Sequence, residues 1–431
     1  MAVAMTVLDA NTLTVLDANT LTVLDATAMT VLVVIRVIVL DATTRTGHAA
    51  MAMTVLDVIR VIIHAARSAT RHLATRTIQA SGLTRPEPSR FCALEMRNRV
   101  GRSQVASSIW GKYDTLLADL DGVVYEGKKA IEPAPAVINH LQSEGVKIGY
   151  VTNNSSRRPE TIAEQLRGFG VHASPEQVVV SSQIGVELLA TLIPAGSKVL
   201  VVGGDGLRHA VTSAGFELVH SSDESPAGVI QGFAPDVAWS HLAEAAFSIQ
   251  KGAKWVATNQ DWTLPQERGI APGNGTLVSA VHTAVGILPP IAGKPEPAIY
   301  HAAVRRFESK APLFVGDRID TDIIGANRAE IDSVLVMTGI STRKEVLGIK
   351  PEGRPTYIIG DLSELTSPYE QPKQTKRGFK AGKTLVELLG NKVRVIDGDP
   401  RSLSALRAAC AVIYNSDLPI YALDVEPALY E

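Results

Sequence analysis

The chain has 431 residues, of which 45% are hydrophobic and 20% are charged, and its formal net charge is −2. This composition is typical of a folded protein with a sizeable core, and it argues against a strongly basic surface for nucleic acid. The two cysteines, Cys92 and Cys410, are far apart, so the sequence shows neither a disulfide framework nor zinc-ligand spacing. We therefore predict a cytoplasmic protein with no membrane or nucleic-acid partner.

The first hundred residues differ in kind from the rest. An eight-residue unit, TVLDANTL at 6–13, is repeated directly at 14–21 and returns in altered form at 22–29. The apolar run 31–40 is interrupted by Arg36 and is too short to span a bilayer. Residues 44–102 are rich in Arg, Ser, Thr and Ala, like a transit peptide, although transit peptides begin at the N-terminus. We expect 1–105 to be a low-complexity, Arg-rich extension that is disordered or reflects a start placed too early, and we prefer a true start near Met96, before which residues 1–95 would not be translated. The alternative is a self-associating β-rich repeat.

Next, an apolar stretch, 115–118, predicts a buried strand that leads into Asp119, Asp121 and Gly122. Side chains two residues apart in a strand share one face, so the two carboxylates would start out together. They repel each other unless a cation lies between them or one keeps a proton. Both solutions suit phosphoryl chemistry, with Mg²⁺ held by oxygen ligands or a nucleophile beside a general acid. A plain polar turn is the alternative.

A second predicted strand, 147–151, ends at Thr152, Asn153 and Asn154, before a helical run that opens near Pro159. Hydroxyl and amide groups at a strand end that faces a helix N-terminus can hold a phosphate. Taken alone, such residues more often form an ordinary helix N-cap.

The segment between about 183 and 290 is too long for a connection and predicts an inserted α/β domain. Its expected strands and helices are 198–202, 206–214, 228–231, 239–250 and 254–257. The insert closes with Asn259, Asp261 and a glycine-rich stretch at 272–275. We consider Asn259 and Asp261 as candidates for contact with a substrate, with simple turn formation as the alternative.

Two further groups follow the insert. Lys294 stands between a glycine and a proline, just before a predicted helix at 298–307, where an isolated lysine is usually a surface charge. A predicted strand at 311–316 then runs into Asp317 and Asp322. In open parallel sheets, ligands bind at the carboxyl ends of the strands, and all of these polar groups fall there.

In order, these motifs are DLDGV at 119–123, VTNNS at 151–155, GKPEP at 293–297 and GDRIDTD at 316–322. Together they resemble the four motifs of haloacid dehalogenase (HAD) superfamily phosphatases. The runs DLDGVVYEG and TNNSSR further resemble the NagD-type, or p-nitrophenylphosphatase-like, subfamily. The resemblance implies a Rossmann-like parallel-sheet core at 112–182 and 291–365, with 183–290 as a large α/β cap.

The resemblance also implies roles. Asp119 would be the nucleophile that becomes an aspartyl phosphate, and Asp121 the general acid and base. Lys294 would neutralise the transition state, and Thr152 would bind a phosphate oxygen. The halide-displacing members lack the second aspartate, so Asp121 favours phosphate esters.

By the same resemblance, Mg²⁺ is held by the Asp119 side chain, the Asp121 backbone carbonyl and Asp317, with Asp322 in support. Asn153 and Asn154 would join Thr152 and Lys294 around the phosphate. Subfamily members are often dimers through the cap, so a homodimer is a further expectation.

After a last core strand at 356–359, residues 366–383 read as a basic linker and 384–431 as a small α/β appendage. Some actinobacterial glycerol-3-phosphate phosphatases resemble the chain in this extension, which favours glycerol 3-phosphate among small phosphorylated metabolites. The alternatives are phosphoglycolate, nucleotide or sugar phosphates, a phosphotransferase, and a non-catalytic protein that binds or senses a phosphometabolite.

Overall fold

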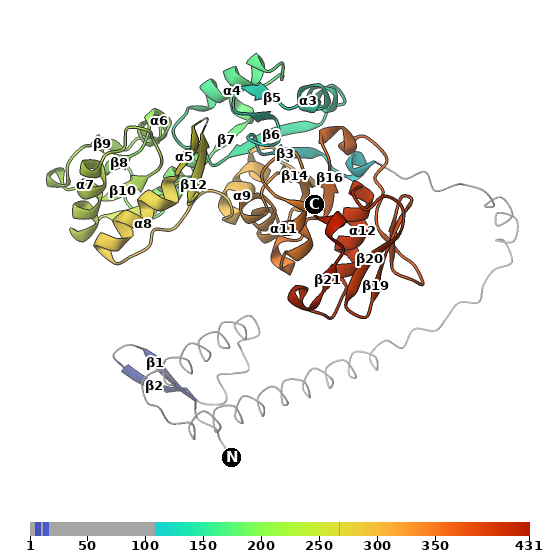
Figure 1. Cartoon of the computed structure of the whole chain (residues 1–431). Helices are drawn as coiled ribbons and strands as arrows, with labels where there is room; N and C mark the ends of the chain where they lie inside the picture. The colour runs from blue at the N-terminus through green and yellow to red at the C-terminus, as the bar shows by residue number, and fades with distance from the viewer. Residues whose placement is uncertain (1–4, 10–11, 17–107, 267) are drawn as a thin grey trace, which may run out of the picture. The chain divides into compact units, whose positions relative to one another are not determined.

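The structure is a computed structural model that describes residues 5–9, 12–16, 108–266 and 268–431 (Figure 1). The chain divides into two units, residues 1–100 and 101–431. In the first unit, strands β1 (Met5–Asp9) and β2 (Thr12–Leu16) form an antiparallel pair in which Met5 lies opposite Leu16. The remainder of the predicted extension 1–105, with the expected start near Met96, lies outside the described residues.

A parallel sheet of six strands forms the centre of the second unit, in the order β16-β15-β14-β3-β6-β7. The strands are β3 (Thr115–Ala118), β6 (Lys147–Thr152), β7 (Val178–Val180), β14 (Pro312–Gly316), β15 (Asp332–Val336) and β16 (Tyr357–Ile359). Every residue of β3 is buried, as expected for a strand covered on both faces. The sheet confirms the predicted α/β class with a parallel core.

Helices cover both faces of this sheet. On one face, α3 (Ala134–Ser143) and α4 (Pro159–Gly168) pack on side chains that include Leu116 and Ala118. On the other face, α5 (Ser181–Ala190), α9 (Pro297–Arg306) and α10 (Ile324–Arg328) pack around Leu117 and Phe314. Alternate residues of β3 therefore pack against opposite helix layers. This packing fixes the position of the strand's C-terminal end from both faces of the sheet.

The insert contains a second parallel sheet, in the order β11-β10-β8-β9 (Figure 1, left). Its strands are β8 (Lys198–Val202), β9 (Glu217–Val219), β10 (Gly228–Gln231) and β11 (Lys254–Ala257), and its helices are α6 (Asp205–Ser213), α7 (Trp239–Gln250) and α8 (Asn274–Val285). The bounds of β8, β10, α7 and β11 agree with the predicted ones. A hairpin of β12 (Thr263–Gln266) and β13 (Gly269–Pro272) occupies a stretch for which no strand was predicted.

The C-terminal segment forms a third sheet, in the order β17-β18-β19-β20-β21, beside helix α12 (Leu403–Tyr414). Its strands are β17 (Lys373–Gln374), β18 (Phe379–Ala381), β19 (Thr384–Leu389), β20 (Lys392–Asp397) and β21 (Asp424–Val425). Both β17 and β18 lie inside the predicted linker 366–383, so this part of the boundary prediction needs correction. Val386 and Leu406 share one buried cluster with Leu335 of β15, so the C-terminal segment packs directly on the core.

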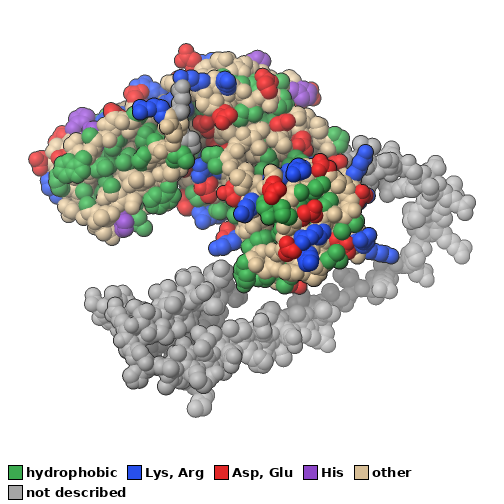
Figure 2. Space-filling view, viewed as in Figure 1, with side chains coloured by type: hydrophobic (Ala, Val, Ile, Leu, Met, Phe, Trp, Pro, Cys, Tyr) green, Lys and Arg blue, Asp and Glu red, His purple; other side chains and the backbone are tan. Residues whose placement is uncertain are grey.

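Two surface properties bear on the expected partners. Acidic and basic side chains are interspersed over the visible face of the described residues (Figure 2). Large apolar side chains are exposed on the insert, including Trp239 and Phe247 of α7 and Leu288 after α8. The homodimer through the cap stays a prediction. None of the helices in the described part of the chain has the length and apolar character needed to cross a membrane.

Candidate active site

The polar groups predicted at the strand ends lie at the edge of the central sheet where its parallel strands have their carboxyl ends. Strand β3 lies between β14 and β6, so Asp119, Asp317 and Thr152 follow or end neighbouring strands. Strand β3 ends at Ala118, so Asp119 and Asp121 both lie in the loop after it rather than within the strand. The predicted strand alternation therefore does not set their directions.

Lys294 is buried at this edge and pairs with two carboxylates. Its Nζ lies 2.7 Å from Oδ1 of Asp119 and 2.7 Å from Oδ1 of Asp322, and the three side chains are 3%, 11% and 0% exposed. Burial alone would lower the pKa of Lys294, but the two carboxylates raise it above its usual value. The lysine is therefore a buried cation between two acids, and the alternative of a solvated surface charge is wrong.

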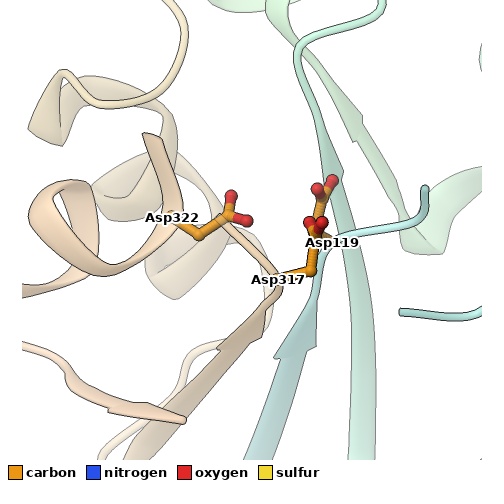
Figure 3. Close-up of side chains that lie close together, drawn as sticks. All are labelled: Asp119, Asp317 and Asp322. Carbon is orange, nitrogen blue, oxygen red and sulfur yellow. The ribbon is translucent and has the colours of Figure 1, made fainter. Parts of the chain in front are cut away.

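Three buried aspartates, Asp119, Asp317 and Asp322, present oxygens within 4.8 Å of one another (Figure 3). Burial, followed by the charges of the other two aspartates, raises the pKa of Asp317 to about 8. Burial raises the pKa of Asp322 to about 6 and that of Asp119 as well, in both cases against the lowering effect of Lys294. One lysine does not balance three acids, so the cluster has room for further positive charge.

Asp317 carries the clearest sign of a metal ligand. Its Oδ2 accepts a hydrogen bond of 2.8 Å from the Ile340 N–H, whereas no donor among the described residues reaches its buried Oδ1. A Cβ atom at Gly122 would lie 2.5 Å from Oδ2 of Asp317, so the carboxylate is held closely on that side. A buried carboxylate oxygen without a donor, among other carboxylates, fits a hard divalent cation such as Mg²⁺.

Asp322 differs from Asp317 because both of its oxygens have partners. Oδ1 pairs with Lys294, and Oδ2 accepts a hydrogen bond of 3.0 Å from the Arg318 N–H. Asp322 lies in a π-helical turn, Ile319–Ile323, whose carbonyls at Thr321 and Asp322 accept from the buried Tyr300 hydroxyl. π-Helical turns are frequent at functional sites. The supporting position at the metal predicted for Asp322 stays a prediction.

Asp121 occupies a different environment from Asp119. Its side chain reaches solvent, unlike those of the three buried aspartates. Partial burial raises its pKa, against the Gly127 N–H and the Arg157 guanidinium, which lower it. A carboxyl group with a raised pKa can carry a proton closer to neutral pH, as a general acid must.

The loop after β6 is shaped by its own side chains. The buried Thr152 accepts a hydrogen bond of 3.1 Å at Oγ1 from the Asn154 N–H. Oδ1 of Asn154 in turn accepts from the Ser156 and Arg157 N–H groups, each at 3.1 Å. The Asn154 side chain thus folds the loop, and its contact with a phosphate stays a prediction.

The two candidate residues of the insert both meet this loop. Asn259, which is buried, donates a hydrogen bond of 2.6 Å to the Asn153 carbonyl. Asp261 accepts from Nδ2 of Asn153 at 3.1 and 3.3 Å, and burial raises its pKa against that hydrogen bond, which lowers it. These residues do more than form a turn, because they join the insert to the core beside Lys294.

Several residues at the site were not predicted. Arg157 lies close enough to Asp121 and Tyr125 to affect the pKa of both. Thr338 donates a hydrogen bond of 2.7 Å to the Gly122 carbonyl, and Ile340 contacts Asp317. Both follow β15, whose carboxyl end lies at the same edge of the sheet. No strand was predicted at 332–336, so the comparison of strand ends did not include them.

Two family models match the core on either side of the insert. One, described as haloacid dehalogenase-like hydrolase, matches residues 116–217, and a second HAD-hydrolase-like model matches 291–365. The chain is 43% identical over 258 residues to D-glycerol 3-phosphate phosphatase of Mycobacterium tuberculosis, which is 60% of this chain and 72% of that protein. The chain belongs to the haloacid dehalogenase-like hydrolases. Within them it is a phosphatase of the NagD/p-nitrophenylphosphatase subfamily that acts on small phosphate esters.

Other relatives match a similar or a larger share of this chain. The acid sugar phosphatase of Staphylococcus saprophyticus is 37% identical over 261 residues, which is 60% of this chain but 99% of that protein. A crystal structure of glycerol phosphate phosphatase from M. tuberculosis in complex with magnesium has a TM-score of 0.68 and 37% identity, and the match covers 74% of this chain and 95% of that one. The crystal structure of the same enzyme in complex with calcium is similar to this chain as well, with a TM-score of 0.68 and 37% identity. As a phosphatase, the chain does not fit the alternative of a non-catalytic binding protein.

Proposed function

We propose that this HAD phosphatase hydrolyses glycerol 3-phosphate through an aspartyl-phosphate intermediate on Asp119. The proposed chemistry rests on one observation: Lys294 forms buried ion pairs with Asp119 and Asp322, next to the Asp317 Oδ1 atom, which has no hydrogen-bond donor among the described residues. The substrate rests on the relatives: over 60% of its length in each case, this chain is 43% identical to the D-glycerol 3-phosphate phosphatase of M. tuberculosis and 37% identical to the staphylococcal acid sugar phosphatase.

In the first step, an oxygen of Asp119 attacks phosphorus while the bond from phosphorus to the ester oxygen breaks. Asp121 gives its proton to the leaving alkoxide, which departs as glycerol. The Lys294 ammonium holds Asp119 in place and balances the negative charge that gathers on the phosphoryl oxygens. The Thr152 hydroxyl, close to the Asn154 N–H, binds a phosphoryl oxygen.

In the second step, Asp121 takes a proton from water, which attacks phosphorus and releases inorganic phosphate. Asp119 is then a free carboxylate, and Asp121 has regained the proton that it gave away. Asp119, Asp317 and the Asp121 carbonyl would hold Mg²⁺, supported by Asp322, and the bound ion neutralises charge around the phosphoryl group. We also propose that residues 112–182 and 291–365 form the catalytic core and that residues 183–290 form the cap.

A panel of esters with released phosphate as the readout tests this function. We expect kcat/KM for glycerol 3-phosphate to exceed that for phosphoglycolate, a nucleoside monophosphate and p-nitrophenyl phosphate by at least about tenfold, or about 1.4 kcal/mol. Sugar phosphates are the second candidate, because the staphylococcal relative is named an acid sugar phosphatase. A sugar phosphate that surpasses glycerol 3-phosphate would overturn the substrate assignment.

Labelled water separates hydrolysis from transfer to another acceptor. Under hydrolysis, one oxygen of each released phosphate comes from H₂¹⁸O. If an added alcohol instead takes up most of the phosphoryl group, the enzyme is a phosphotransferase.

A further inference from the structure

Asn153 uses its side-chain amide to hold the backbone of Lys294 on both sides. Its Oδ1 accepts a hydrogen bond of 2.7 Å from the Lys294 N–H, and its Nδ2 donates one of 3.0 Å to the Lys294 carbonyl. The two groups belong to one residue, 141 positions away in the chain. The amide therefore sets the position from which the lysine side chain reaches Asp119.

The same Nδ2 group also donates to Asp261, at 3.1 Å to one carboxylate oxygen and 3.3 Å to the other. A carboxylate can only accept and a backbone N–H can only donate, so Asp261 and the Lys294 N–H together fix which end of the amide faces which partner. The contact with Asp261 thus helps to hold the amide in the orientation that Lys294 needs.

Asp261 is itself firmly attached to the insert. It follows β11, and its carbonyl accepts a hydrogen bond of 2.9 Å from the Gly275 N–H in the first turn of α8. The Asn153 carbonyl is held as well, by the Ser181 hydroxyl at 2.7 Å and by Asn259 at 2.6 Å. A movement of the insert away from the core would therefore displace Asn153 or break its hydrogen bonds to Asn259 and Asp261.

We propose that Asn153 is a positioning residue that couples Asp261 of the insert to Lys294, so that the lysine is aligned with Asp119 only while the insert lies on the core. This goes beyond the phosphate contact expected for Asn153, and it rests on the proposed use of Asp119 and Lys294 in the reaction. The coupling explains how closure over a substrate could prepare the site without Asp261 touching the phosphoryl group.

Four variants test the coupling with p-nitrophenyl phosphate as substrate. Asn153→Ala and Asp261→Ala should each lower kcat by about 10- to 100-fold with little change in KM, because a small misplacement of a reacting group costs about that much. The double variant should be no slower than the slower single variant, since both changes break one linkage. Asp261→Asn keeps an acceptor for the amide and should retain most of the activity.

An exchange of the two groups is a sharper test. Asn153→Asp alone sets two carboxylates against each other and should lower kcat by about 100-fold. Adding Asp261→Asn restores a donor and acceptor pair in reverse, and should recover about tenfold of that loss. Recovery by a second change that is harmless alone cannot come from general damage to the fold.

Asn139 provides the matched control. Its Nδ2 donates to the Gly170 carbonyl at 2.7 Å, and its Oδ1 accepts from the His172 N–H at 2.8 Å, the same pattern outside the site. Asn139→Ala should lower the melting temperature and leave kcat unchanged. The proposal is wrong if folded Asn153→Ala loses no more kcat than Asn139→Ala, if the losses at 153 and 261 multiply in the double variant, or if the exchange gives no recovery.

Failure of the proposed function would look different. If the wild type cleaves p-nitrophenyl phosphate but not glycerol 3-phosphate, the substrate assignment fails while the coupling is still measured. If Asp119→Asn keeps turnover, the aspartyl-phosphate route fails. The affinity for orthovanadate, read from the shift in melting temperature, should show the same dependence on Asn153 and Asp261 without any turnover.

Discussion

The Nζ atom of Lys294 lies 2.7 Å from Oδ1 of Asp119, in a position where the two side chains are 3% and 11% exposed. Such a pair offsets the cost of burying each charge, and the removal of one partner leaves the other charge without compensation. Asp322, at the same distance from Nζ, shares this dependence on the lysine. The relationship is therefore structural as well as catalytic.

Lys294→Met should lose turnover and also unfold more readily. The change leaves Asp119 and Asp322 buried without a cation, which we expect to lower the free energy of unfolding by about 3–5 kcal/mol in the absence of metal. Urea unfolding in EDTA measures this. Lys310→Met, at an exposed lysine, is the control and should change neither property. Equal stability of Lys294→Met and wild type would contradict the buried ion pair.

Asp119→Asn should abolish hydrolysis while the fold is kept. The amide is close in size to the carboxylate but is a poor nucleophile, so kcat should fall by about a thousandfold or more. Asp320→Asn is the matched control, because Asp320 belongs to the same acidic motif but is 66% exposed and pairs with Arg318. Released phosphate measures both. Comparable activity of the two variants would exclude Asp119 as the nucleophile.

Removal of divalent metal should stop turnover, and Asp317 should carry the response of stability to Mg²⁺. In EDTA, Asp317→Asn should melt at or above the wild-type temperature, because burial and the two neighbouring aspartates disfavour ionisation of the Asp317 carboxyl in the folded protein. Mg²⁺ binding should raise the melting temperature of the wild type, and it should raise that of the variant much less. Thermal unfolding with and without Mg²⁺ checks this. The metal assignment fails if both proteins respond alike.

Gly339→Ala should reduce activity by displacing Asp317. A Cβ atom at Gly339 would collide with the Asp317 carboxylate, and the nearest atoms belong to Asp317 itself. Gly168→Ala, at the end of α4, meets nothing within 4 Å and should be neutral or slightly stabilising. Steady-state rates at several Mg²⁺ concentrations compare them, and the Gly339 variant should need more metal for its residual activity.

Asp114 should make stability depend on pH below the neutral range. Its burial acts to raise the pKa, but hydrogen bonds from Ser309, Lys310, Thr115 and Ala311 together hold the pKa well below its usual value. Stability from Asp114 is therefore present above the unfolded-state pKa of about 4 and is lost as pH falls.

Asp114→Ala should then be destabilised by about 1.5–3 kcal/mol at pH 7, with a smaller difference from wild type near pH 3. Asp236→Ala, at an exposed position, is the control. Denaturant unfolding at the two pH values measures the difference. A deficit that does not shrink at low pH would contradict the lowered pKa.

Much of the site could be predicted because its groups stand at strand ends. The expected strand at 147–151 agrees closely with β6, which ends at Thr152. The expected helix at 298–307 agrees closely with α9, which begins shortly after Lys294. The contact between Asn153 and Asp261 could not be predicted, because the two residues are 108 positions apart and meet only once both sheets are folded. Local pattern carries no signal for such a pair.

Three of the strands missed by the sequence can be explained by their composition. Both β12 and β13 contain a proline, and β17 has only two polar residues, Lys373 and Gln374. Prolines and short polar runs favour turns over strands in isolation. These strands form because a neighbouring strand supplies their hydrogen bonds, which is a property of the folded chain rather than of the segment.

The position of β14 between β3 and β15 has a consequence for synthesis on the ribosome. β3 is made first and β14 follows only after the whole insert, so one edge of β3 stays unpaired while about two hundred residues are translated. An open apolar edge can pair with other nascent chains. We expect chaperones that bind emerging chains to matter most in this interval, and expression to fail most often when translation stalls within the insert.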